Sequence, residues 1–193
     1  MNRSSFLRHF SLASPTQLSI KCPQQQHHRK AAVLIALIER DDELHIIFTE
    51  RALHLRHHPG QVSFPGGKHE TFDSSLQQTA IRETNEEIGI KPEFIEIIGQ
   101  LPSLKTTSGF EVFPIVAFVD QRFSLNIDAN EVKSVFEVPL RFLLDSKNFH
   151  LQHLIANKKR HSTYCIGYQN NLIWGATAQM LKNLQQLLLS NDV

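Results

Sequence analysis

Three glutamates, Glu83, Glu86 and Glu87, lie close together in the segment 82–90. At 100° per residue of helix they fall within an arc of about 100°, beside the apolar arc of the same helix. The next lysine comes after the expected end of the helix, so no cationic side chain four residues later offsets their repulsion. Carboxylate oxygens suit Mg²⁺ or Mn²⁺, which bind through a few carboxylates and substrate phosphates. The cluster predicts a divalent-metal site, and the alternative is a solvated acidic helix end.

Two helices are predicted from apolar residues at helical spacing. The first covers Asp73 to Ile88, and Gly89 follows it where a C-terminal glycine cap belongs. Its apolar arc consists of Leu76, Ala80, Ile81, Thr84 and Ile88. The second covers Thr177 to Leu189 and carries a stripe that we interpret as core or homodimer packing. This stripe consists of Met180, Leu181, Leu184, Leu187 and Leu188.

Short runs rich in Val and Ile predict strands before, between and after these helices. The predicted strands cover 31–39, 44–49, 61–64, 94–98, 112–119, 135–138, 163–166 and 172–174. This mixed order indicates an α+β fold and argues against a regular doubly wound sheet. A length of 193 residues fits one such domain, which we place at 31–193.

The acidic helix and the turn before it resemble the Nudix box: Gly, five residues, Glu, seven residues, Arg-Glu-apolar-x-Glu-Glu-x-Gly-apolar. The second half matches Arg82 to Ile90, with Thr84 in place of a more usual apolar residue. The distance from Gly67 to Arg82 is one residue longer than in the general pattern. Ser74, with Asp73 beside it, stands where the first glutamate is expected. The resemblance implies a Nudix-type α/β/α sandwich, with a mixed sheet flanked by helices.

The segment upstream is similar to the signature of the coenzyme A pyrophosphatases within this family. It reads Thr49-x-Arg51-Ala52-x-x-x-Arg56-x-x-x-Gly60-x-x-x-Phe64-Pro65-Gly66-Gly67. That subgroup also tends to have the longer glycine-to-arginine spacing and an aspartate at the position of Asp73. The similarity continues through Glu131 and the segment 135–140 to 173–178, and so covers most of the chain from residue 30 to residue 180.

The resemblance implies a metal-dependent hydrolysis of the coenzyme A diphosphate to 4′-phosphopantetheine and adenosine 3′,5′-bisphosphate. The metal ligands would be Glu83, Glu86 and Glu87, holding Mg²⁺ or Mn²⁺. The base that accepts the proton of water would be Glu86 or, our preferred choice, Glu131. Arg82 would orient the glutamates. Substrate binding would fall to Arg51 and Arg56, which suit phosphates, and to the turn that contains Phe64, Gly66 and Gly67.

Each of these residues also has a purely structural interpretation. Arg51 and Arg56 fit surface charges lying over the sheet. Glu131 fits the start of a helix, because Asn130 before it is a good N-cap. Two other functions also stay open: a Nudix hydrolase acting on ADP-ribose, a dinucleotide or a diadenosine polyphosphate, and a non-catalytic nucleotide-binding Nudix domain. The intact glutamates argue against the second.

Charge and composition exclude several classes of protein. The net charge is +1, and residues 39–193 carry 15 basic and 19 acidic side chains, a net charge of −4. A nucleic-acid-binding body is therefore not expected. The longest apolar stretch, 31–38, is far shorter than a membrane-spanning helix. The two cysteines lack metal-ligand spacing and fit a reducing, cytoplasmic setting.

Residues 1–30 form a separate N-terminal arm with five basic residues and no acidic one. Phe6, Leu7 and Phe10 fit a short amphipathic helix that docks on the domain, and a transit peptide is the alternative. Residues 14–30, with two prolines and a glutamine-histidine run, are predicted to form a loop that leads into the domain.

Overall fold

The computed structural model describes residues 1–12, 28–156 and 159–190. Its main layer is an eight-stranded mixed sheet. Strand β1 (Arg29–Arg40) lies at the centre, antiparallel to β2 (Glu43–Arg51) and parallel to β7 (Phe110–Val119). Strand β8 (Val132–Pro139) pairs with β2, and β5 (Ile95–Gln100) pairs with β7. The short strands β3 (Val62–Ser63), β4 (Gly66–Lys68) and β6 (Leu104–Lys105) complete it.

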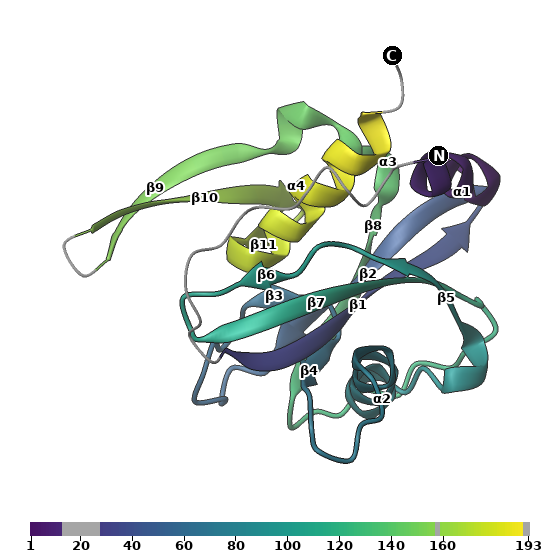
Figure 1. Ribbon diagram of the computed structural model, residues 1–193, viewed down its shortest axis with the longest axis horizontal. Helices are drawn as coiled ribbons and strands as arrows, with labels where there is room; N and C mark the ends of the chain where they lie inside the picture. Colours follow the sequence, from purple (N-terminus) through teal and green to yellow (C-terminus); the bar gives the residue numbers. More distant parts are fainter. Residues whose placement is uncertain (13–27, 157–158, 191–193) are drawn as a thin grey trace.

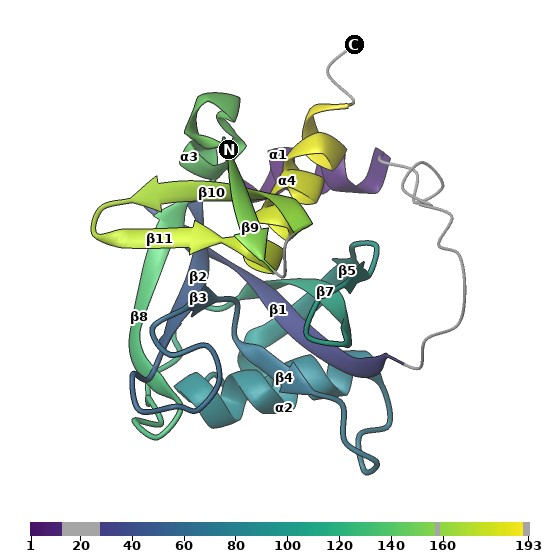
Figure 2. The same cartoon turned by 90° about the vertical axis from the view of Figure 1, so that its left-hand side faces the viewer.

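Helices cover both faces of this sheet (Figure 1). Helix α2 (Leu76–Ile88) lies on one face, and α1 (Arg3–Leu12) and α4 (Gly175–Leu189) lie on the other, as Figure 2 also shows. A second sheet of β9 (His150–Ala156), β10 (Lys159–Tyr168) and β11 (Asn171–Trp174) lies on the side of α4. The predicted α/β/α sandwich with a mixed sheet is confirmed. The described helices include none that is long and apolar enough to span a membrane.

The alternation of side chains along β1 explains the two cores. Ala32, Leu34 and Ala36 point toward α2, whereas Ile35 and Leu37 point toward α1 and α4. The predicted stripe of α4 packs into this second core, where Met180, Leu181, Leu184 and Leu188 are buried and Leu187 is partly buried. The stripe therefore packs within the domain.

Several boundaries differ from the sequence prediction. Strand β1 begins at Arg29, inside the predicted loop, whose residues 14–27 lie outside the described part of the chain. Helix α2 begins at Leu76 instead of Asp73, because Ser75 caps it by accepting from the Gln78 amide. Residues Pro92–Phe94 form a 3₁₀ turn before β5, and Ser146–Asn148 form another. Strands β4, β6 and β9 and helix α3 (Leu140–Leu144) are not predicted from the sequence, because they are short or lack a clear apolar alternation.

Helix α1 shares the core of the domain. Phe6 is fully buried, and its ring stacks on Phe10 with centroids 5.6 Å apart and meets Phe118 of β7 at 5.9 Å. Arg3 forms an ion pair with Glu96 of β5. These contacts attach the start of the chain to the face of the sheet opposite α2.

Candidate active site

Helix α2 directs its glutamates toward the end of the sheet where β4 pairs with β1. The helix ends as predicted at Gly89, which adopts φ +77° and donates its amide to Asn85 O at 2.9 Å. Glu87 is buried, the Glu83 side chain is 15% exposed and the Glu86 side chain is 56% exposed. Two of the three carboxylates are therefore enclosed by protein.

The glycine turn fits directly against these two carboxylates. The Gly66 amide donates to Glu87 Oε2 at 3.2 Å. A Cβ atom at Gly67 would lie 2.5 Å from both Cδ and Oε2 of Glu83. Only a residue without a side chain leaves room for the Glu83 carboxylate here.

Burial sets the electrostatics of the carboxylates. It raises the pKa of Glu87 to about 8, because the charged form loses its hydration. The Gly66 amide and the positive charge of Arg51 oppose this shift, whereas Glu131 and Glu83 add to it. Burial also raises the pKa of Glu83, and the charges of Glu86 and Glu131 contribute. The carboxylates of the site therefore outnumber the positive charges of Arg51 and Arg82 beside them.

Arg82 is held in a fixed position by Asp73. Its Nε donates to Asp73 Oδ1 at 2.9 Å and its Nη2 donates to Oδ2 at 3.0 Å. The Asp73 carboxylate is fully buried and also accepts from the Glu70 amide and the Thr79 hydroxyl. The Arg82 guanidinium holds the pKa of Asp73 far below its usual range. From this anchor, Arg82 reaches Glu83 Oε1 at 3.0 Å and Glu86 Oε2 at 2.8 Å.

The structure brings Arg51 and Glu131 to the same site. Strand β2 ends at Arg51, where a bulge shifts its register with β8. The amide of the next residue, Ala52, donates to Glu131 O at 2.9 Å. Glu131 closes a turn before β8 and does not begin a helix, so that structural interpretation is wrong. His54 Nε2 lies 3.0 Å from Asn130 O and joins the same two loops.

Two predicted substrate-binding residues do not contact this group of side chains. Phe64 is 1% exposed, and its ring stacks on Phe48 in the core at a centroid distance of 5.1 Å, so the ring is unavailable to a substrate. The prediction for this turn concerns its backbone, and the buried Phe64 ring attaches the turn to the core. Arg56 is exposed, and within the described residues it makes no hydrogen bond or ion pair.

Two residues with clear positions here were not selected as site residues from the sequence. Asp73 matches a position of the family pattern, but its nine-residue separation from Arg82 corresponds to no contact within a helix. Phe72, whose ring lies beside Arg82, occupies a loop with no periodic pattern. Both contacts depend on how the loop between β4 and α2 folds back.

The donor set fits a hard divalent cation. Within the described ranges, no three His, Cys, Asp or Glu side chains already form a compact ligand group, because Glu83 and Glu86 turn toward Arg82. The carboxylates nevertheless share one edge of α2. The Glu83 carboxylate occupies the space that a side chain at Gly67 would fill, and burial disfavours the charged forms of Glu83 and Glu87. A cation bound by oxygen ligands would relieve that cost.

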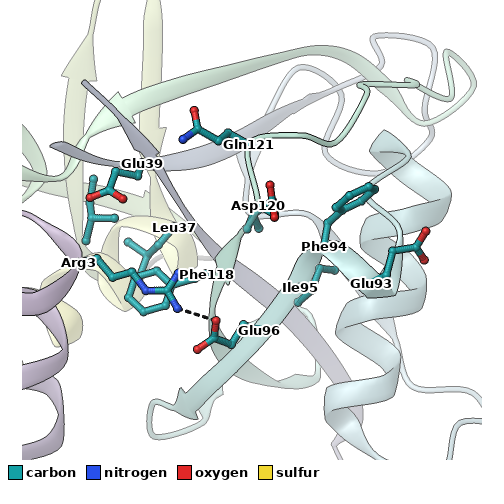
Figure 3. A pocket seen from close by; sticks show the side chains of 12 residues that line it. Arg3, Leu37, Glu39, Glu93, Phe94, Ile95, Glu96, Phe118, Asp120 and Gln121 are labelled. Atoms are coloured by element: carbon teal, nitrogen blue, oxygen red, sulfur yellow. Dashed lines mark hydrogen bonds and ion pairs between the residues drawn. The ribbon is translucent and has the colours of Figure 1, made fainter. Parts of the chain in front are cut away.

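A cavity of about 320 Å³ lies elsewhere, between α1 and the start of β5 (Figure 3). Arg3 crosses it to Glu96, and Phe118 and Leu37 form part of its wall. None of the predicted site residues lines it. It is therefore separate from the carboxylate site.

Comparison with known proteins agrees with this geometry. The family model of the NUDIX domain matches residues 27–154. A curated relative named "Uncharacterized Nudix hydrolase NudL", from Enterobacter sp. (strain 638), is 39% identical over 158 residues, which are 82% of each chain. The protein of the same name from Salmonella dublin is 37% identical over 179 residues, 93% of this chain and 91% of its own.

The fold also matches a solved structure, the Nudix hydrolase RenU from M. smegmatis. The TM-score is 0.52 at 16% identity, over 61% of this chain and 74% of that chain. At 16% identity, the similarity to RenU shows only a shared fold. The family model and the curated relatives also match the sequence of the site. The chain therefore belongs to the Nudix hydrolases, enzymes that cleave the diphosphate bond of nucleoside diphosphate derivatives with the help of a divalent metal ion.

Proposed function

We propose that this Nudix hydrolase cleaves the diphosphate of coenzyme A or of a coenzyme A derivative, with Mg²⁺ or Mn²⁺ as cofactor. The observation that carries the proposal is the position of Arg51. This arginine belongs to the segment that resembles the coenzyme A pyrophosphatase signature, and its charge acts directly on Glu87 of the Nudix box. One residue of this signature, Arg51, is thus close enough to the carboxylates for its charge to act on them.

Glu83, Glu86 and Glu87 would hold the divalent ion, with Arg82 keeping the first two oriented. When bound, the ion would neutralise the diphosphate and lower the pKa of the attacking water. Glu131 would accept the proton of this water, and Glu86 is the alternative base. The charge of Glu131 already acts on Glu83 and Glu87, which supports its place opposite the helix. The water oxygen bonds to one phosphorus, and the bridging oxygen leaves on the other phosphate.

Arg51 and Arg56 would bind the phosphate groups of the substrate, since a guanidinium offers a fork of donors. The exposure of Arg56 leaves its donors available for this role. Gly66 and Gly67 would contribute backbone beside the substrate, and the missing side chains leave room for β1 at Gly66 and for the Glu83 carboxylate at Gly67. Coenzyme A also has a 3′-phosphate remote from the scissile bond, which requires a cationic contact of its own.

The direct test incubates the purified protein with coenzyme A and Mg²⁺ or Mn²⁺ and identifies the products by mass. We expect 4′-phosphopantetheine and adenosine 3′,5′-bisphosphate, with no turnover in a chelator. ADP-ribose and a diadenosine polyphosphate serve as competing substrates. Clearly faster turnover of ADP-ribose would overturn the substrate and leave the chemistry intact. Glu83→Gln, prepared in parallel, controls for contaminating activity and should lower kcat by several powers of ten.

A second arm of the same experiment compares coenzyme A with 3′-dephospho-coenzyme A in the parent, Arg51→Ala and Arg56→Ala. An arginine that binds the 3′-phosphate raises KM for coenzyme A when removed, because that contact is equal in the ground and transition states. Its loss should have no effect on the dephosphorylated substrate. Equal penalties on both substrates for both variants would reject this role.

A further inference from the structure

Phe72 is the most exposed large apolar side chain in the described part of the protein. It lies in the loop between β4 and α2 and is 70% exposed. The loop is closed by a turn in which the Asp73 amide donates to Glu70 O at 3.1 Å and the Glu70 amide donates to Asp73 Oδ2 at 3.0 Å. The turn therefore holds the apolar Phe72 ring in water, and this exposure is unfavourable because the ring is not buried against other apolar groups.

The ring lies beside the charged group that organises the active site. The Arg82 guanidinium carbon is 5.3 Å from the centroid of Phe72, within the range of a cation–π contact. The two hydrogen bonds from Arg82 to Asp73 fix that guanidinium, and the same arginine contacts Glu83 and Glu86. Phe72 is therefore held at the edge of the carboxylate site, with most of its surface still accessible.

We propose that Phe72 is the stacking platform for the purine base of the nucleotide substrate. The inference rests on the proposed function, in which the scissile diphosphate lies at the glutamates of α2. In coenzyme A the adenosine is attached directly to this diphosphate, so its base lies near the site, whereas the pantetheine arm leaves from the other phosphate. A flat apolar ring next to a guanidinium suits a purine, which stacks on aromatic faces and on arginine.

Other interpretations of the exposed ring are weaker. Leu53 is similarly exposed, at 65%, in the loop after Arg51, but a leucine offers no face for stacking. Trp174, the other aromatic side chain among the exposed large apolar residues described, is only 38% exposed and lies on β11. Among the residues whose side chains the structure describes, only Phe72 combines an aromatic face, high exposure and contact with a residue that touches the glutamates.

The test separates the two halves of the substrate. The dissociation constants of adenosine 3′,5′-bisphosphate and of 4′-phosphopantetheine are measured by calorimetry in the presence of Mg²⁺, for the parent and for Phe72→Ala, Phe72→Leu and Phe72→Tyr. We expect Ala and Leu to weaken binding of the adenine-containing ligand by roughly 5- to 20-fold, at the lower end of measured base stacking. The affinity for 4′-phosphopantetheine should not change, and Tyr should restore the parent affinity.

Leu172→Ala is the matched control. It removes an exposed apolar side chain elsewhere, on β11, and should alter neither affinity. Equal weakening for both ligands in Phe72→Ala, or no weakening for either, would overturn the platform. So would a parent protein that does not bind adenosine 3′,5′-bisphosphate. These binding measurements do not depend on turnover. An enzyme that fails to hydrolyse coenzyme A, yet shows the Phe72-dependent loss, would refute the proposed substrate and retain the platform.

Discussion

Glu87 combines a buried carboxylate with a single hydrogen bond from the Gly66 amide. The bond favours the charged form, but burial outweighs it, so the pKa of Glu87 rises to about 8. In the unfolded chain the pKa of a glutamate lies near its usual value of about 4.3. The folded protein therefore holds the Glu87 proton more tightly than the unfolded chain does. The associated stability is complete below about pH 4 and is lost as the pH rises toward 8.

Glu87→Gln should remove this pH-dependent loss, because glutamine keeps an oxygen to accept from Gly66 and carries no charge. In a chelator at pH 8 we expect the variant to exceed the parent in free energy of unfolding by about 1 kcal/mol or more. The difference should shrink as the pH falls toward 5. Urea unfolding followed by circular dichroism at several pH values measures it.

The same variant should lose most of its hydrolytic rate, because a glutamine amide is a poor substitute for a carboxylate ligand. Glu93→Gln on the surface, in the 3₁₀ turn before β5, is the charge-matched control for both measurements. A Glu87→Gln enzyme with near-parent kcat would show that Glu87 does not hold the metal ion. If the difference in free energy of unfolding between the parent and Glu87→Gln does not change between pH 5 and pH 8, the raised pKa of Glu87 is contradicted.

The start of β4 shows how two adjacent glycines serve different purposes. Gly66 has φ +147°, and a Cβ there would lie 2.4 Å from the backbone oxygen of Ala32 and 2.5 Å from Val33 Cα. These are backbone atoms of the central strand, which cannot move without breaking the pairing of β4 with β1. At Gly67, in contrast, the added Cβ meets only the end of the Glu83 side chain.

Gly66→Ala and Gly67→Ala should therefore have separable effects. We expect Gly66→Ala to lower the free energy of unfolding by roughly 2 kcal/mol or more, from strain and overpacking against β1. Gly67→Ala should change stability by less than about 1 kcal/mol, because the Glu83 side chain can rotate away. The displaced carboxylate should nevertheless lower kcat at least tenfold.

Thermal unfolding and steady-state kinetics on both variants, at saturating metal ion, make the comparison. A Gly67→Ala enzyme with parent activity would show that the position of the Glu83 carboxylate is not critical. Equal stability losses in the two variants would contradict the distinction between backbone and side-chain contacts.

At the scale of the whole molecule, the N-terminal helix α1 and helix α2, which carries Glu83, Glu86 and Glu87, lie on opposite faces of the sheet (Figure 2). Helix α1 approaches β5 so closely that a Cβ at Gly99 would lie 2.5 Å from Cε1 of Phe10. A register shift of β5 between Ile97 and Gly99 accompanies this contact. Helix α1 can therefore pack this closely only because Gly99 has no side chain.

Gly99→Ala should displace the Phe10 ring by steric overlap and lower the free energy of unfolding by about 1–2 kcal/mol. Because the contact is remote from α2, kcat and KM should stay at the parent values. In a Phe10→Ala background the same substitution should cost much less, since the clashing ring is gone. Additive losses in the double variant would show that Phe10 does not pack on Gly99.

Local sequence patterns were sufficient to predict several features. The spacing of apolar residues and Gly89 predicted the body and end of α2, and the same spacing placed its three glutamates on one edge. Helical periodicity relates residues within one or two turns, so such contacts can be read directly from the chain. Runs of Val and Ile likewise located β1, β2 and β7, whose exact ends differ from the predicted ones by at most two residues.

The contacts that complete the site join segments far apart in the chain, and only the tertiary structure decided them. The pairing of β4 with β1 sets Gly66 against Glu87, and the fold of one loop joins Asp73 to Arg82. Arg51, at the end of β2, is close enough for its charge to act on the Glu87 carboxylate. The same packing buried Phe64 and exposed Phe72, although both are phenylalanines in turns beside the motif. Strand register and loop closure are collective properties of the core, and the local sequence does not determine them.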